Sequence, residues 1–250
     1  MKTEWDYTNL VNAYLKRPDY AQGAIDRMLS VAGIREGDAV CDVGAGTGNL
    51  TRMLAAKKLE VTAVEPNEAM RAAGIEKSRG FPGIRWVEGV GEHTGQAEES
   101  FRLVSFGSSF NVTERQQTLR ETHRILARGG WFACMWNHRN LEDPVQSGIE
   151  KIIRTHLPDY AYGTRREDQT EVIRSSGLFT EIQYFSSEVN HTLKTGDIIE
   201  AWSSHATLKR QAKDQFDRIL GEIEEYLRSF HADRLTVPYT TRVWMARASK

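Results

Sequence analysis

The sequence predicts an α/β protein built on a doubly wound, mostly parallel sheet of seven strands. Short apolar runs of the length of a buried strand recur along the chain, and the segments between them carry apolar residues at helical spacing. Strands that alternate with helices are typical of parallel sheets, because each crossover helix returns the chain to the same edge. A glycine-rich turn at residues 44–48, between the first apolar run and a helical pattern, is the third observation.

The first 139 residues hold five of the expected strands. Their apolar runs are residues 39–43, 60–64, 84–87, 101–106 and 131–136. Helical spacing occurs at residues 24–35, 66–75 and 114–130. We expect Gly129 and Gly130 to end the last of these helices, whose final turn carries the basic residues that a helix dipole favours.

Beyond residue 139 the regular alternation weakens. An irregular, partly helical stretch at residues 139–168 precedes an expected helix at 170–177 and a sixth strand at 179–195. Residues 196–236 are largely helical in pattern and lead to a last strand at residues 240–246. We interpret the irregular stretch and the second helical region as segments of a substrate cap.

Length and composition limit the class of protein. The 250 residues are enough for one domain, residues 1–250, with a sizeable core. The net charge of −1 shows no excess of basic residues, which a nucleic-acid-binding protein usually has. No apolar run approaches the roughly 20 residues of a membrane helix, and the polar N-terminus is unlike a signal peptide. Cys41 and Cys134 each lie inside an apolar run, which indicates buried free thiols in a reducing cytoplasm.

The glycine-rich turn has the spacing Gly-x-Gly-x-Gly and follows Asp42. Glycines here let the backbone approach a ligand, because no Cβ stands in the way. A dinucleotide-binding turn requires a third glycine three residues after the second, and that position is Asn49. The spacing therefore disfavours a nicotinamide cofactor.

A carboxylate stands at the end of the second expected strand. Glu65 follows residues 60–64 and lies 21 positions after Gly44. A carboxylate at this position can accept hydrogen bonds from both hydroxyls of a ribose. Taken alone, Glu65 is more often a solvated loop acid; together with the glycine turn it favours a nucleoside ligand.

These features resemble class I S-adenosylmethionine (SAM)-dependent methyltransferases, in particular the small-molecule type of the trans-aconitate methyltransferase group. The resemblance extends over about residues 10–247 and is carried by the segments listed here: Arg17-Pro18-Asp19-Tyr20, Asp42-Val43-Gly44-Ala45-Gly46-Thr47-Gly48, Glu65-Pro66-Asn67, the Glu121, Arg124, Leu126, Gly129-Gly130 signature, and Trp136-Asn137. Arg102 departs from the family, which usually has an aspartate there. The resemblance also implies that the last strand is antiparallel and pairs with the sixth, with a helical cap inserted before it.

The resemblance implies SAM as the cofactor and assigns residues to it. The implied SAM-binding residues are Tyr14, Arg17, Asp42, Gly44, Ala45, Gly46, Gly48, Glu65, Pro66, Met70, Gly91, Glu92, Gly107 and Ser108. Residues 1–23 are either an N-terminal lid over SAM or a helix that packs on the sheet. Met70 lies either under the adenine or in the core. Gly91 and Glu92 occupy the turn that caps the adenine in the family, or a plain surface turn.

The acceptor site is predicted less sharply. Methyl transfer from a sulfonium is an in-line displacement, which requires a general base only when the nucleophile arrives protonated. His138 and His205 are the candidate bases, although a lone histidine is more often structural. The candidate acceptor-binding residues are Asn137, Trp202, Tyr239 and Arg165. Trp202 and Tyr239 suit the core of the cap equally well, and Arg165 with Arg166 forms either an anion clamp or a solvated pair.

The predicted function is SAM-dependent transfer of a methyl group to an O, N or C atom of a small metabolite, of class EC 2.1.1. A SAM-binding protein without transfer activity is the alternative, and a nicotinamide-dependent oxidoreductase is disfavoured. A nucleic-acid methyltransferase is disfavoured by the charge and by Ser108-Ser109-Phe110-Asn111 after the fourth strand. We expect a small-molecule partner, no nucleic-acid or membrane partner, no metal, and a cytoplasmic monomer or homodimer.

Overall fold

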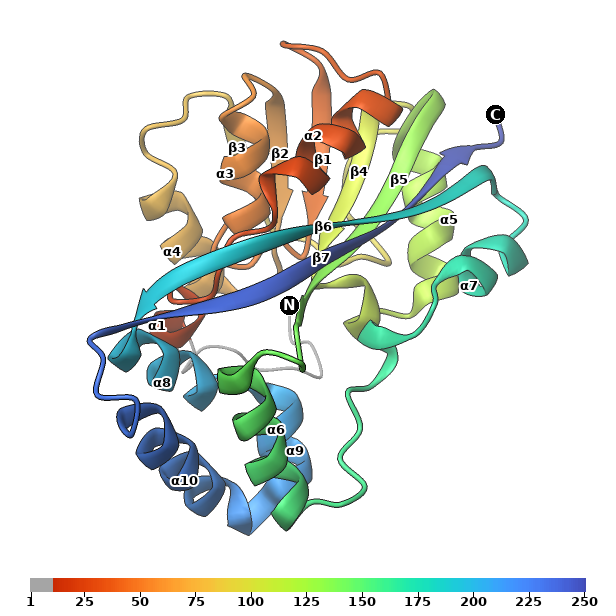
Figure 1. Cartoon of the computed structure of the whole chain (residues 1–250). Helices are drawn as coiled ribbons and strands as arrows, with labels where there is room; N and C mark the ends of the chain where they lie inside the picture. Colours follow the sequence, from red (N-terminus) through yellow and green to blue (C-terminus); the bar gives the residue numbers. More distant parts are fainter. Residues whose placement is uncertain (1–10) are drawn as a thin grey trace.

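A seven-stranded sheet forms the centre of the molecule, in the order β3-β2-β1-β4-β5-β7-β6 (Figure 1). The computed structural model describes residues 11–250, apart from the side chains of Asn12 and Ala13. Residues 1–10 of the predicted lid therefore lie outside the described residues. Strand β7 runs antiparallel to β5 and β6, and the other pairs are parallel. The α/β class and the antiparallel last strand are confirmed.

The strands match the predicted apolar runs in position, and β5 and β7 are longer than expected. Their bounds are β1 (Ala39–Val43), β2 (Glu60–Val64), β3 (Ile84–Val87), β4 (Phe101–Gly107), β5 (Leu126–Arg139), β6 (Phe179–Lys194) and β7 (Arg234–Ala248). Strand β7 begins six residues before residue 240 because Arg234 already pairs with Lys194 of β6. The two strands form a long ribbon that reaches from the sheet to the cap (Figure 1).

Helices cover both faces of the sheet and form the cap. Their bounds are α1 (Val11–Tyr14), α2 (Gln22–Val31), α3 (Asn49–Ala55), α4 (Glu68–Lys77), α5 (Arg115–Ile125), α6 (Pro144–His156), α7 (Thr170–Ser175), α8 (Thr195–Ser203), α9 (Ala206–Ala212) and α10 (Phe216–Arg228). Short 3-10 helices are η2 (Phe110–Val112), η3 (Thr164–Arg166) and η4 (Lys213–Gln215). None of the helices that the structure describes combines the length and the hydrophobicity that a membrane span requires.

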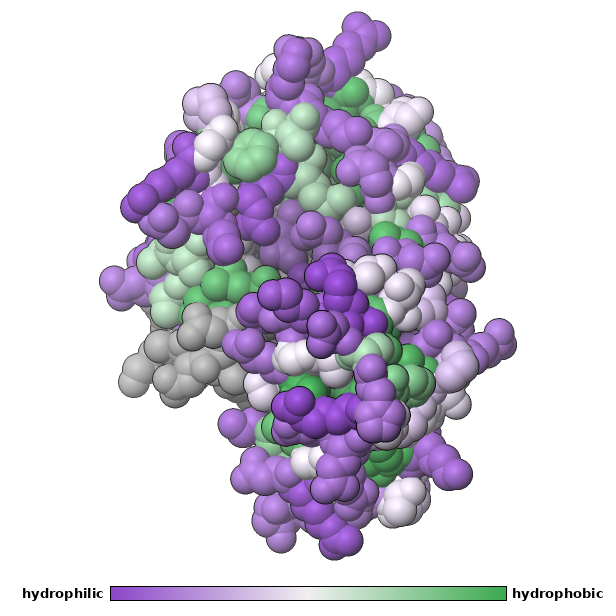
Figure 2. Space-filling model, turned by 60° about the vertical axis from the view of Figure 1, so that its left-hand side comes forward, coloured by the Kyte–Doolittle hydropathy of each residue, from purple (hydrophilic) through white to green (hydrophobic). Residues whose placement is uncertain are grey.

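Three apolar clusters hold these layers together. Helices α2 and α3 pack on one face of the sheet, and α5 and α7 pack on the other. The third cluster lies in the cap, where α6, α8, α9 and α10 pack on the far end of β7. Figure 1 shows these cap helices gathered below the carboxyl ends of the parallel strands. On the face shown in Figure 2, hydrophilic residues predominate and hydrophobic ones form smaller, separate areas.

The prediction that glycines end helix α5 is wrong. The helix ends at Ile125, and Leu126 takes an extended conformation and pairs with Phe101 of β4. Gly129, with φ of +68°, lies in the irregular start of β5, where the register with β4 shifts. The glycines therefore lie where the pairing of β5 with β4 is irregular.

The two cysteines lie as expected. Cys41 on β1 and Cys134 on β5 are buried free thiols, and β4 separates their strands. Burial raises the pKa of both thiols well above its ordinary value.

Candidate functional site

A cavity of about 570 Å³ lies beyond the carboxyl ends of the parallel strands and extends to the cap. This is the position where open α/β sheets bind their ligands. All the predicted site residues line the cavity except Gly48. Gly48 precedes α3 with a φ of +81°, and a Cβ there would approach the Trp86 ring.

The glycine turn is fastened to β2 and faces the cavity. The amides of Gly44 and Ala45 both donate to the Val64 carbonyl, at 2.8 and 3.0 Å. A Cβ on Gly44 would overlap the side chain of Ser109, whose hydroxyl donates to the Val43 carbonyl at 2.6 Å. A Cβ on Gly46 would have no protein atom within 4 Å. The turn is thus closed toward the protein at its first glycine and open toward the cavity at its second.

Glu65 is held beside this turn by backbone amides. Gly46 donates to Oε2 at 2.8 Å, and Asn67 donates to Oε1 at 2.9 Å. The carboxyl group is buried, which raises its pKa. Because each carboxylate oxygen has two lone pairs, both oxygens keep an acceptor position for a ligand.

Asp42, near the end of β1, is fully buried, and only one of its two carboxylate oxygens has a hydrogen-bond partner. Its Oδ2 accepts a hydrogen bond from Thr51 at 2.6 Å, while Oδ1 has no partner. Burial, with a smaller contribution from the charge of Glu65, raises the pKa of Asp42 to about 7. An unpartnered acceptor in a ligand cavity fits a ligand that carries a hydrogen-bond donor or a positive charge there.

This pKa makes stability depend on pH. Between about pH 4 and 7 the folded protein keeps a proton on Asp42 that the unfolded chain has lost, so stability falls as pH rises through this window, by an amount on the order of 4 kcal/mol. Asp42→Asn removes this titration and keeps an acceptor for Thr51. We therefore expect the free energy of unfolding of the variant, relative to wild type, to increase from pH 5 to pH 8 in denaturant titrations. The exposed Glu68→Gln is the control, and a constant difference for Asp42→Asn would contradict the assignment.

At the end of β4 lies a hydroxyl pair, of which the sequence analysis named Ser108 as a site residue but not its partner Tyr20. Ser108 has a φ of +61°, and its Oγ lies 2.9 Å from the Tyr20 hydroxyl. A Cβ on Gly107 would lie 2.9 Å from the same Tyr20 oxygen. The loop therefore depends on glycine at 107, and it sets two hydroxyl groups on the cavity wall.

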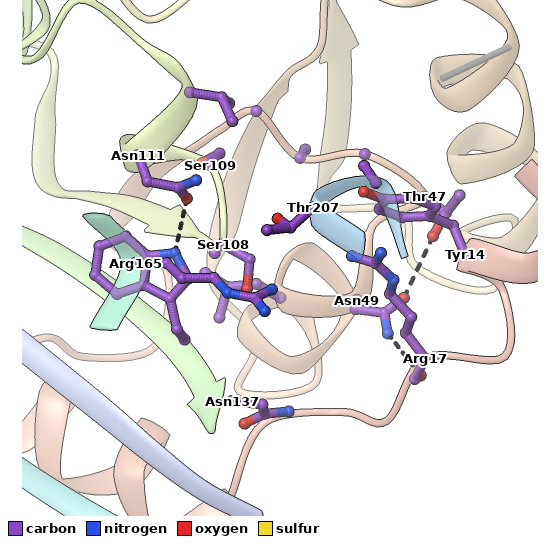
Figure 3. A pocket seen from close by; sticks show the side chains of 18 of the residues that line it. Tyr14, Arg17, Thr47, Asn49, Ser108, Ser109, Asn111, Asn137, Arg165 and Thr207 are labelled. Carbon is purple, nitrogen blue, oxygen red and sulfur yellow. Dashed lines mark hydrogen bonds between the residues drawn. The ribbon is translucent and has the colours of Figure 1, made fainter. Parts of the chain in front are cut away.

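The segment after α1 crosses from the sheet to the cap. Arg17 lies 3.6 Å over the Tyr14 ring and donates to the Ser204 carbonyl in the cap at 3.1 Å. Asn49 donates to the Arg17 carbonyl at 3.3 Å (Figure 3). Asn137 donates to the Asp19 carbonyl at 2.9 Å and accepts from Thr241. The side-chain amide of Asn137 thus holds the segment after α1 in place, whereas the sequence analysis predicted that it binds the acceptor.

The residues predicted to lie around the adenine contact both the cavity and other parts of the protein. Met70 is 2 % exposed and still lines the cavity, so it belongs to the core and to the cavity wall. Gly91 is buried against Thr113 and Thr118, where a Cβ would be too close. The Glu92 carboxylate accepts from the Glu114 amide, which ties the turn to the start of α5.

Both candidate bases, His138 and His205, form hydrogen bonds with backbone groups. The Nε2 of His138 donates to the Arg165 carbonyl at 3.1 Å, and burial beside Arg166 and Arg242 lowers its pKa to about 3. The Nδ1 of His205 accepts from the Leu208 amide at 3.2 Å, and burial lowers the pKa of His205 well below its ordinary value. Neutral rings with weak basicity make poor general bases near pH 7.

The remaining predicted residues lie on the cap side. Trp202 is in the cap core and also lines the cavity, where it stacks on His205 with ring centroids 5.0 Å apart. Tyr239 lies on β7 and also lines the cavity, and Arg165 extends its guanidinium into the cavity (Figure 3). Arg139, at the end of β5, is a lining residue that the sequence analysis did not single out. Its only sequence signal is its position near the carboxyl end of the fifth expected strand.

Comparison with known proteins gives the family context. Residues 41–134 match the family model for a methyltransferase domain. The chain is 34% identical over 111 residues to a ubiquinone/menaquinone biosynthesis C-methyltransferase of Rubrivivax gelatinosus. The aligned region is 44% of this chain and 43% of that protein, so the chain spans less than half the length of this relative. It is 24% identical to an uncharacterized methyltransferase of Schizosaccharomyces pombe over 89% of this chain and 86% of that one.

Solved methyltransferases share the fold over nearly the whole chain. A putative type II methyltransferase from Anaeromyxobacter dehalogenans superposes with a TM-score of 0.68 at 18% identity, covering 92% of this chain and 97% of that one. A Haemonchus contortus phosphoethanolamine N-methyltransferase, solved with phosphomonomethylethanolamine and S-adenosylhomocysteine, gives a TM-score of 0.59 at 14% identity, covering 97% and 58%. Residues 41–134 thus match a methyltransferase-domain family, and the chain has the Rossmann-like fold of these solved structures.

Proposed function

We propose that this methyltransferase-domain protein is a class I enzyme that moves the methyl group of SAM to an oxygen, nitrogen or carbon atom of a small metabolite and leaves S-adenosylhomocysteine. The narrower proposal, a member of the trans-aconitate methyltransferase group, rests on the Arg17-Pro18-Asp19-Tyr20 and Trp136-Asn137 segments. In this proposal residues 1–23 form a lid, and residues 139–168 and 196–236 form the acceptor cap.

The position of Glu65 is the observation that carries the proposal. Its carboxylate is fixed by the Gly46 and Asn67 amides at the edge of the cavity, with acceptor positions left over for two ribose hydroxyls. The open space at Gly46 and the unpartnered oxygen of Asp42 also fit SAM, which carries two positive charges on its methionine portion. Together these features support a nucleoside with a cationic tail.

The protein's part in the reaction is mainly alignment. SAM supplies a methyl group that is already activated by the sulfonium. The Tyr20–Ser108 pair and the glycine loops shape the wall, and Arg17 closes the cavity by joining the N-terminal segment to the cap. Holding two reactants in line and away from water provides effective molarities of about 10⁵–10⁸ M. His138 and His205 remain proposed bases, although their lowered pKa values favour an acceptor that needs no base.

Calorimetric titration of the full chain tests the proposal. We expect SAM and S-adenosylhomocysteine to bind at micromolar concentrations and NADH not to bind. Incubation with SAM and a library of small metabolites should then release S-adenosylhomocysteine, detected by mass spectrometry. Binding without product for any acceptor would favour a SAM-binding protein without transfer activity. Absence of SAM binding with NADH bound would favour an oxidoreductase.

A further inference from the structure

The charged residues of the cavity are separated by sign. Its lining carboxylates are Asp42 of β1, Glu65 directly after β2, and Glu92 in the turn after β3. Its lining arginines are Arg17, Arg139, Arg165, Arg166 and Arg210. Arg139 ends β5, and Arg165, Arg166 and Arg210 lie in the cap segments. The acceptor side of the cavity therefore carries a surplus of positive charge.

Two hydrogen-bond donors face each other on this side. Because the Nδ1 of His205 accepts from the Leu208 amide, the neutral ring carries its proton on Nε2. An Nη2 of Arg165 lies 3.3 Å from that Nε2. Neither group can accept from the other, so both protons remain available to an acceptor atom placed between them. Burial and the neighbouring guanidinium groups of Arg139 and Arg17 lower the pKa of Arg165 to about 10, which leaves it charged at neutral pH.

Arg139 adds a third donor. Its side chain is 9% exposed, and its Nη1 is buried without a hydrogen-bond partner. The Nη2 reaches Glu150 at 3.4 Å, a carboxylate that also accepts from Arg154 at 2.8 Å. The guanidinium lies 4.5 Å over the Trp202 ring, which fixes its plane in the cavity wall. A buried guanidinium with an unpaired N–H is costly unless a ligand supplies the acceptor.

We propose that the methyl acceptor carries an oxyanion, a carboxylate or phosphate, and that this group binds between Arg139, Arg165 and the Nε2–H of His205. The inference rests on the proposed function and names the acceptor class for the same cavity. Arginines bind such groups through parallel N–H···O bonds, and a neutral imidazole supplies a further donor. In this assignment His205 is a substrate-binding donor. Arg17, on the N-terminal segment beside Asn49, is left for the methionine carboxylate of SAM.

The test uses the full chain saturated with S-adenosylhomocysteine in a phosphate-free buffer. Calorimetric titrations measure the affinity of the proposed anion site for inorganic phosphate, succinate and the uncharged succinamide. We expect saturable binding of phosphate or succinate and none of succinamide; the stronger of the two anions identifies the oxyanion. Arg139→Gln and Arg165→Gln should each weaken anion binding by about 10-fold or more, which is the loss of one charged hydrogen bond.

Controls separate this inference from the proposed function. The exposed Arg174→Gln on α7 should bind anions and S-adenosylhomocysteine as wild type does, and Arg165→Lys should retain part of the anion affinity. Circular dichroism confirms that each variant is folded. The inference is overturned if anions bind equally to wild type and both glutamine variants, if wild type binds no anion, or if Arg165→Gln weakens only S-adenosylhomocysteine. Failure of S-adenosylhomocysteine to bind wild type refutes the proposed function, and titration of the unliganded chain then still decides the anion site.

Discussion

Replacing Glu65 by alanine is expected to weaken SAM binding by at least about 100-fold. Two hydrogen bonds from ribose hydroxyls to an ionised carboxylate are each worth about 1.5–3 kcal/mol. The substitution also leaves the amides of Gly46 and Asn67 without their acceptor, so the glycine turn loses the group that orders it. Calorimetric titration with SAM and S-adenosylhomocysteine measures the effect, and both ligands should lose affinity equally because they share the ribose.

The matched control is Glu60→Ala. Glu60 lies on the same strand at its opposite end and is exposed, so its removal changes the charge by the same amount away from the cavity. It should bind SAM as wild type does. Glu65→Gln is informative as well, because its amide would place an N–H group against a backbone N–H donor, and we expect it to bind weakly. Wild-type affinity in a folded Glu65→Ala protein would remove the main support for the proposed function.

The meeting of the residues proposed to bind the cofactor could be predicted from sequence because they are close in the chain and in space. The glycine turn follows β1, Glu65 ends β2, and β1 pairs with β2 in parallel register, from Ala39 with Glu60 to Val43 with Val64. A register of this kind brings the ends of both strands together automatically. Spacing along the sequence therefore predicted which residues meet, and the cavity lining contains both.

The meeting of the residues now proposed to bind the acceptor could not be predicted in this way. Arg139 ends β5, Arg165 lies in η3, and His205 precedes α9, so their meeting depends on how the cap folds onto the sheet. None of these positions belongs to a periodic pattern. The Tyr20–Ser108 pair, 88 positions apart, was missed for the same reason. The end of α5 was misplaced because local glycine signals cannot show that Leu126 gains a strand partner in β4.

Replacing Gly44 by alanine is expected to destabilise the fold and abolish SAM binding. Gly44 has a φ of +68°, which costs an L-residue roughly 1–2 kcal/mol. Its new Cβ would also overlap Ser109, and overpacking of this kind costs about 1–3 kcal/mol. The loop after β4 has to move, because the Ser109 hydroxyl is bonded to the Val43 carbonyl. We expect a melting temperature lower by roughly 5–15 °C, measured by calorimetry, since each kcal/mol corresponds to about 2–4 °C at this chain length.

Two other glycines separate backbone strain from loss of the ligand space. Gly95 has a φ of +70°, is exposed, and has no atom within 4 Å of an added Cβ, so Gly95→Ala reports strain alone. Gly46 has the same open surroundings at φ +57°, but its open side is the cavity. Gly46→Ala should therefore melt close to Gly95→Ala and bind SAM at least tenfold more weakly, because the methyl group takes space that the ligand needs. Equal SAM affinity in these two variants would mean that the ligand does not contact the turn. A low melting temperature in Gly44→Ala alone would still establish that the first glycine serves the packing of β1 against the loop after β4.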